Sequence, residues 1–167
     1  SLGTGGAGGQ VDLTATGGTI AVANITASGG ASTFGGGTGG AAANINLTTT
    51  GGTNDITLNG VLAAAGGAGG TLGLSKTVTL TGTGAIVDGN TTTNNVTAQK
   101  LVISAQTGVG TPADATLETT VTDLDIQNGT SGNIGLSNAQ ALNVLRVAQT
   151  GNGTVTLGTG AGGITIA

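Results

Sequence analysis

Aliphatic and small polar residues alternate along most of this chain. In the stretch VDLTAT (11–16), polar residues separate Val11, Leu13 and Ala15. The same alternation recurs in INLTTT (45–50), ITL (56–58), TVTLT (77–81), TVTL (154–157) and ITI (164–166). Successive side chains of a strand point to opposite faces, so this period of two predicts β-strands with one buried face. Most of the runs end at Gly or Asn, which favour tight turns.

Similar segments also repeat along the first half of the chain. DLTATGGTI begins at Asp12, and NLTTTGGTNDI begins at Asn46, 34 positions later. LTGTGAI at Leu80 continues the series, and the glycine-rich segments 29–42 and 63–70 lie between the strand-like runs. The sequence leaves open whether a repeat of this length makes one coil of chain or nearly two.

Composition excludes several fold classes. Of 167 residues 36 are Gly, 6% are charged and 1% are aromatic, whereas average proteins have about 7% Gly and about 25% charged residues. A hydrophobic fraction of 37% argues against disorder, and clustered glycines with a single Pro argue against collagen. Strand period, glycine turns and repetition together predict an all-β solenoid of roughly five to eight coils, about 25–40 Å long at about 4.8 Å per coil.

Charge and cysteine usage restrict the partners. The net charge is −4, and Lys76, Lys100 and Arg146 are too scattered to follow a phosphate backbone, so nucleic acid is not expected. The absence of Cys excludes disulfides and thiolate metal sites. No run of about 18 apolar residues predicts a membrane-spanning helix. Because the chain starts at Ser1, we expect residues 1–167 to be one segment of a longer repeat protein.

Two local features depart from the regular pattern. SNAQALNVLRVAQ (137–149) could form about three helical turns capped by Ser137, but a strand is favoured because both flanks alternate with a period of two. Phe34 is the only aromatic residue, and we expect it to be a local plug in a narrow core that otherwise holds Val, Ile, Leu and Ala.

A longer pattern occupies residues 82–144. GAIVDG at Gly84–Gly89 leads to VTAQKLVISAQTGVGT at Val96–Thr111, and LETTVTDL and GNIGLSN follow at Leu117–Leu124 and Gly132–Asn138. This series resembles a repeat of large filamentous-haemagglutinin-like bacterial adhesins of two-partner secretion. The chain departs from that pattern at Val109, where the family has Ile.

The resemblance implies a right-handed parallel β-helix, export through an outer-membrane partner and a role at the bacterial cell surface. It is close for 82–144, and the irregular glycine-rich repeats 1–81 and the glycine-rich repeat 145–167 match the family only loosely. The family repeats have no catalytic residues to assign here.

Asp123 and Asp125 are the only candidate metal ligands. Side chains two positions apart share a strand face, and paired carboxylates occur in glycosidases and in calcium sites. A solvated acidic pair is the favoured interpretation, because the chain has no Trp, Tyr or His to build a sugar site. Calcium remains a weak alternative, and no other cofactor is expected.

Other motifs give little sign of chemistry. GTGGAGG (3–9) and GTGAGG (158–163) lack the Lys-Ser/Thr of a phosphate-binding loop, so coil corners are expected. No His is present to activate a nucleophile, so we expect no enzyme activity. Asn-x-Thr sequons allow a glycan at Asn24, Asn46, Asn90, Asn95, Asn128 and Asn152.

The predicted function is structural. We expect an extracellular surface fibre that associates with itself through its edge coils and contacts a host cell, a neighbouring cell or a matrix. One alternative is an ice-binding surface built from Thr77/Thr79, Thr81/Thr83 and Thr154/Thr156. Another is the receptor-binding passenger region of a secreted adhesin.

Overall fold

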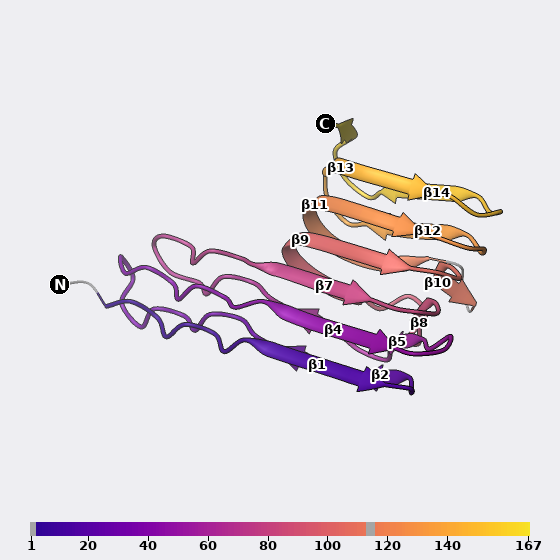
Figure 1. Cartoon of the computed structure of the whole chain (residues 1–167). Coiled ribbons are helices and arrows are strands. Elements are labelled where there is room, and N and C mark those ends of the chain that lie inside the picture. Colours follow the sequence, from indigo (N-terminus) through magenta and orange to yellow (C-terminus); the bar gives the residue numbers. More distant parts are fainter. Residues whose placement is uncertain (1–2, 113–115) are drawn as a thin grey trace.

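The computed structural model describes residues 3–112 and 116–167, and its regular structure there is entirely β (Figure 1). The strands are β1 (Val11–Thr16), β2 (Ile20–Val22), β3 (Ile25–Thr26), β4 (Ile45–Thr50), β5 (Ile56–Leu58), β6 (Leu62–Ala63), β7 (Thr77–Thr81), β8 (Ile86–Asp88), β9 (Val96–Ala105), β10 (Val109–Pro112), β11 (Leu117–Asn128), β12 (Ile134–Asn138), β13 (Leu142–Gln149), β14 (Val155–Thr159) and β15 (Ile164–Ile166).

The strands stack in columns of parallel neighbours, which Figure 1 shows rising from indigo to yellow. The first column contains β1, β4, β7, β9, β11, β13 and β15. The second contains β2, β5, β8, β10, β12 and β14, and a third starts with β3 and β6 and continues into the first residues of β9. The all-β prediction is confirmed, and the parallel stacking is compatible with a β-solenoid.

The register of the first column gives the length of each coil. Val11 pairs with Ile45, and Ile45 pairs with Val78, so the sequence repeat corresponds to one coil. The Thr50–Thr16 contact between these coils spans 34 residues. Higher in the stack the coils shorten, because Gln127 and Ser104 on adjacent coils are 23 residues apart.

Aliphatic side chains fill the interior in vertical rows. Leu47, Leu80, Ile103 and Ile126 lie in register on four successive coils, and each has 0% of its surface exposed. Burial of one such side chain contributes about 1.5–3 kcal/mol. The alternation in the sequence therefore identified the core-facing positions of these strands correctly.

Glycine-rich segments form a second structure beside the strands, which we call the glycine arm (residues 3–10, 27–44 and 64–76). Figure 1 shows it projecting to the left of β1, β4 and β7. Gly5 and Gly8 donate backbone hydrogen bonds to Thr38 and Ala41 at 2.9 and 2.8 Å. These donors lie three residues apart, which matches the three residues per turn of polyproline II chains rather than the two of a strand.

The arm has two layers, and main-chain hydrogen bonds cross between them. Gly73 donates to Gly67, Gly67 to Gly40, Gly40 to Gly30 and Gly30 to Gly6, at 2.8–2.9 Å. A Cβ placed on Gly40 would collide with the Gly6 carbonyl. Glycine is required here because a side chain would not fit between the two layers.

Two expectations for this region are wrong. Residues 3–9 form part of the arm and are not a coil corner, because their amides pair with the next coil. Phe34 is no core plug, since 57% of its surface is exposed and its ring lies against Gly3 at the edge of the arm.

Above β7 the coils contain no glycine arm and are therefore shorter. β9 and β11 each run through the corner as one continuous strand, and two successive residues point outward where the chain bends. These are Gln99 with Lys100, and Thr122 with Asp123. Residues 142–149 form strand β13, which confirms the strand assignment and excludes a helix there.

Buried asparagines close the upper corners. Asn95, Asn128 and Asn138 each have 0% exposure. Asn138 donates to the carbonyls of Val121 (3.0 Å) and Gln140 (2.8 Å), and its own oxygen accepts from the Val121 amide (2.9 Å). The side-chain amide thus makes the hydrogen bonds that the backbone of a neighbouring strand would otherwise make at this turn.

Candidate functional site

Asp123 and Asp125 lie on the outer face of β11, as predicted. Asp123 Oδ1 accepts a hydrogen bond from Asn143 at 2.9 Å, and its Oδ2 accepts one from Gln99 at 3.3 Å. Asp125 forms an ion pair with Arg146 Nε at 2.6 Å. Both carboxylates therefore face donors on neighbouring coils and connect those coils, which favours a structural role over calcium binding.

A further carboxylate connects the first two coils. Asn46 donates to Asp12 Oδ1 at 2.7 Å, and Gln10 donates to Oδ2 at 2.8 Å. The Asn46 bond and then the Gln10 bond hold the pKa of Asp12 below its ordinary value of 3.8. The bonded carboxylate thus stabilises the fold above pH 3.8, and this contribution is lost as the pH falls through the lowered pKa.

Replacing Asn46 by Ala is expected to raise the pKa of Asp12 toward its ordinary value, because the larger of the two stabilising hydrogen bonds is removed. A carboxyl-carbon NMR titration measures this directly. Gln10→Ala is the matched control and should give a smaller rise. An Asp12 pKa that is the same in Asn46→Ala and the wild type would contradict the assignment.

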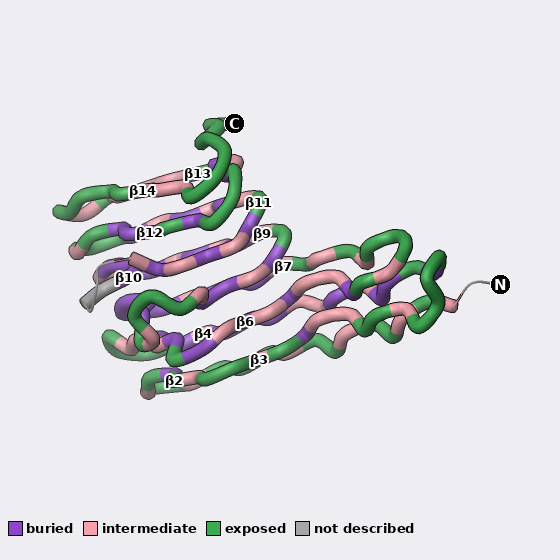
Figure 2. Tube along the Cα trace, turned by 180° about the vertical axis from the view of Figure 1, so that it is seen from behind, coloured by how far each residue is buried: buried purple, intermediate pink, exposed green. Residues whose placement is uncertain are grey.

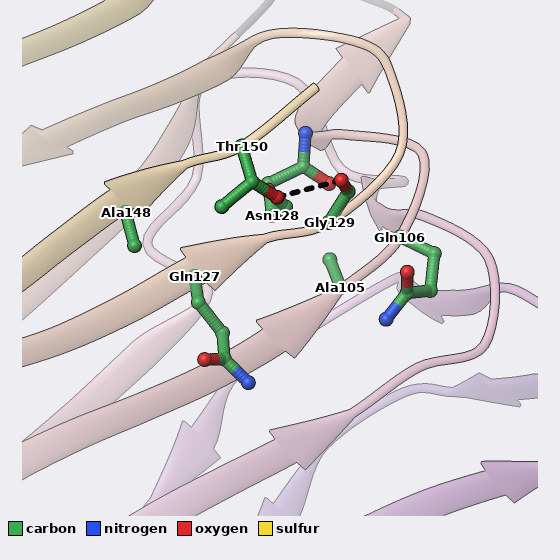
Figure 3. Close-up of a pocket in the computed structure, with 7 residues that line it drawn as sticks. All are labelled: Ala105, Gln106, Gln127, Asn128, Gly129, Ala148 and Thr150. Carbon is green, nitrogen blue, oxygen red and sulfur yellow. Dashed lines mark hydrogen bonds between the residues drawn. The ribbon is translucent and has the colours of Figure 1, made fainter.

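A shallow hollow of about 170 Å³ lies where β9, β11 and β13 end (Figure 3). It is lined by Ala105, Gln106, Gln127, Asn128, Gly129, Ala148 and Thr150. The Thr150 hydroxyl donates to the Gly129 carbonyl at 2.7 Å, and Gln127 donates to Ser104 at 2.9 Å. The lining has no titratable side chain, and its single hydroxyl is the one that Thr150 already donates to Gly129.

The threonine rows are short. Thr14, Thr48 and Thr81 lie in register on three successive coils, and Ser104 follows above Thr81. Thr156 pairs with Gly135 in the second column and thus belongs to another face. The predicted Thr pairs are therefore not brought together into one surface.

The two ends of the stack expose residues of the core rows (Figure 2). Leu13 on the first coil is 40% exposed, whereas Leu47, its partner in register, is fully buried. At the other end Val155 is 42% exposed and Ile166 is 81% exposed. A hollow of about 310 Å³ opens there, lined by Val144, Leu145, Arg146, Val147, Val155, Leu157, Ile164 and Ile166.

Burial restricts the sequons and points to a further polar residue. Asn95 and Asn128 are fully buried, so a glycan does not fit at either.

Asp88 is 2% exposed at the end of β8. Sequence reasoning gave Asp88 no role, although it stands two positions after Ile86, at a core-facing place in the alternation.

No group of three or more His, Cys, Asp or Glu side chains lies together in residues 3–112 and 116–167. Nor does that part of the chain contain a helix long and apolar enough to cross a membrane. Comparisons with protein-family models, with curated proteins and with solved structures each found no match. The arguments about function therefore rest on the geometry of the chain itself.

Proposed function

We propose that this chain is a non-catalytic structural rod that associates end to end through its terminal coils, in the manner of an adhesin-type fibre at a bacterial cell surface. The supporting observation is the exposure of core-row residues at both ends. Apolar rows that are open to water, at Leu13 on the first coil and at Ile166 on the last, favour the addition of another coil.

The backbone at the ends favours the same association. β1 and β2 each pair on one side only in the described chain, and so do β14 and β15. Unpaired strand edges are templates for another strand. Because the first and second columns run through the whole stack, two copies would join head to tail through these columns, with the glycine arm overhanging.

The proposed fold is the right-handed parallel β-helix of filamentous-haemagglutinin-like repeats. Parallel strands joined by a crossover in one sheet are right-handed in about 98% of cases, which supports this hand. The spaced pattern over residues 82–144 supports the adhesin assignment, and the outer faces rich in Thr, Asn and Ser suit a surface exposed to water.

Electron microscopy of the purified chain tests the association. Uniform filaments one coil stack wide are expected, and Ile164→Lys combined with Ile166→Lys should abolish them, because the charges would be buried in the joint. Thr165→Lys is the matched control, since this residue lies between the two isoleucines on the same strand and should leave filaments intact. Dispersed short rods from the wild type would count against end-to-end assembly.

One observation favours a second candidate. The row of Thr14, Thr48 and Thr81 presents hydroxyls at the regular spacing of the coils, as an ice-binding surface requires. Ice recrystallisation in the presence of the wild type and of Thr48→Lys separates the two functions. Equal crystal growth in both samples and in buffer removes the ice-binding candidate.

A further inference from the structure

Three Asn-Gly pairs lie at corners of the stack, and their surroundings differ. They are Asn59–Gly60, Asn128–Gly129 and Asn152–Gly153. In such a pair the backbone nitrogen of Gly can attack the side-chain amide carbon of Asn, because Gly has no side chain to obstruct the approach and adopts many backbone conformations. The reaction requires a Gly nitrogen without a hydrogen-bond acceptor and an Asn side chain that can turn toward it.

The Asn128–Gly129 pair is protected from this reaction. Asn128 is fully buried, and its side chain makes four hydrogen bonds of 2.8–3.1 Å to the groups around it. The Gly129 nitrogen donates to the Ala105 carbonyl at 3.0 Å. Attack would break all of these bonds, so this corner must open before the pair can react.

The Asn152–Gly153 pair meets both requirements. Both residues are exposed in the corner between β13 and β14. Within residues 3–112 and 116–167, neither the Asn152 side chain nor the Gly153 nitrogen makes a hydrogen bond. In this part of the chain the second column ends at β14, so the corner has a neighbouring coil on one side only, where Asn152 bridges Ser131.

The Asn59–Gly60 pair is intermediate. Asn59 is exposed, but Gly60 is buried, and its Cα lies so close to the Asn24 side chain that a Cβ would collide with the Asn24 oxygen. That oxygen is itself held by the Val61 amide, which donates to it at 2.8 Å. The packing restricts movement of the Gly60 main chain, so its nitrogen should approach the Asn59 side chain less readily.

We infer that Asn152 is a site of spontaneous deamidation. The Gly153 nitrogen forms a bond to the Asn152 side-chain carbon and loses its proton, and the NH₂ group takes up a proton and leaves as ammonia. Water then adds to either carbonyl of the resulting cyclic imide and opens it to aspartate or isoaspartate. Water is consumed and ammonia is released, so the reaction needs no oxidant, reductant or cofactor.

Either product adds a carboxylate next to β14. Isoaspartate also lengthens the main chain by one carbon atom, because the chain then runs through the former side-chain carbon. The neighbouring Thr154 carbonyl accepts from the Ile134 amide at 2.9 Å. We expect the lengthened corner to weaken this bond, so the Ile134 amide should exchange with solvent faster in the modified chain.

Mass spectrometry of peptides from the dilute, folded chain, after incubation at mildly alkaline pH, measures the reaction at each pair. Deamidation raises a peptide's mass by about 1 Da, because OH replaces NH₂. Trypsin separates the three pairs into different peptides, since it cleaves after Lys76, Lys100 and Arg146. Asn152 should react fastest and Asn59 more slowly, and Asn128 should react at least about a hundredfold more slowly than Asn152.

Two controls separate the effect of the fold from that of the sequence. In guanidinium chloride the three pairs should react at similar rates, because the hydrogen bonds that protect Asn128 are lost. Asn152→Gln should stop the mass gain of the last peptide, since the longer side chain cyclises far less readily, and should leave the other two pairs unchanged. Equal rates at Asn152 and Asn128 in the folded chain would overturn the inference, as would an unreactive Asn152 that reacts only after unfolding.

Discussion

Replacement of Asn138 by Leu is expected to lower the free energy of unfolding by about 3–5 kcal/mol. Leu has the same number and branching of side-chain heavy atoms and is larger than Asn, so the loss comes from hydrogen bonds rather than from a cavity. The substitution removes the partners of the Val121 N–H and C=O groups, the Gln140 carbonyl and the Thr119 hydroxyl. The two Val121 groups become buried without the amide that pairs with them, at about 1–3 kcal/mol each, and these costs are not additive. The other two groups lose less, because Gln140 is exposed and the Thr119 hydroxyl can still donate to the Ser137 carbonyl at 3.4 Å.

Urea unfolding followed by circular dichroism measures this change. Asn143→Leu is the matched control, because Asn143 is only half-buried and makes a single side-chain bond, to Asp123 at 2.9 Å. Its cost should stay below about 1 kcal/mol. Equal losses in the two variants would show that the buried amide is not a structural element of the corner.

Replacement of Gly40 by Ala should destabilise the glycine arm by about 1–3 kcal/mol. The new Cβ would overlap the main-chain atoms of Gly5 and Gly6, which have no flexible end that could move aside. The hydrogen bonds from Gly40 to Gly30 and from Gly67 to Gly40 would lengthen as the layers separate. The strands above β7 contain no arm and should keep their stability, since each coil contacts only its neighbours.

Amide hydrogen exchange resolves this effect by region. Faster exchange is expected at Gly30, Gly67 and Gly73, and unchanged exchange in β11 and β13. Gly9→Ala is the control from the same arm, because a Cβ there meets nothing within 4 Å. Equal amide exchange rates at these glycines in Gly40→Ala and Gly9→Ala would disprove the close contact between the two layers.

The corners show what a local sequence pattern can and cannot predict. Gly and Asn mark them in the sequence, and Asn128 and Asn138 do lie at turns. Yet both side chains point inward and are fully buried. Residue type alone does not distinguish a solvated turn amide from one that bonds to the backbone of another coil, because the difference depends on the neighbouring coil. For the same reason the sequence singles out the outer pair Asp123 and Asp125 and gives no signal that Asp88 is a buried carboxylate.

The sequence by itself determined the strands and their buried faces. Alternation is a local property of the chain, and a shift of one residue would turn every aliphatic side chain of a strand toward water. The burial of Leu47, Leu80 and Ile103 follows from it directly.

Only the tertiary structure decided which residues meet between coils. The repeat of 34 residues is one coil because Val11 pairs with Ile45. The later coils are shorter because β9 and β11 bend directly through the corner, whereas the earlier coils have the glycine arm at that corner. The arm itself depends on carbonyl groups approaching glycines from another layer, as Gly6 approaches Gly40. Contacts of this kind join residues far apart in sequence, so no local period records them.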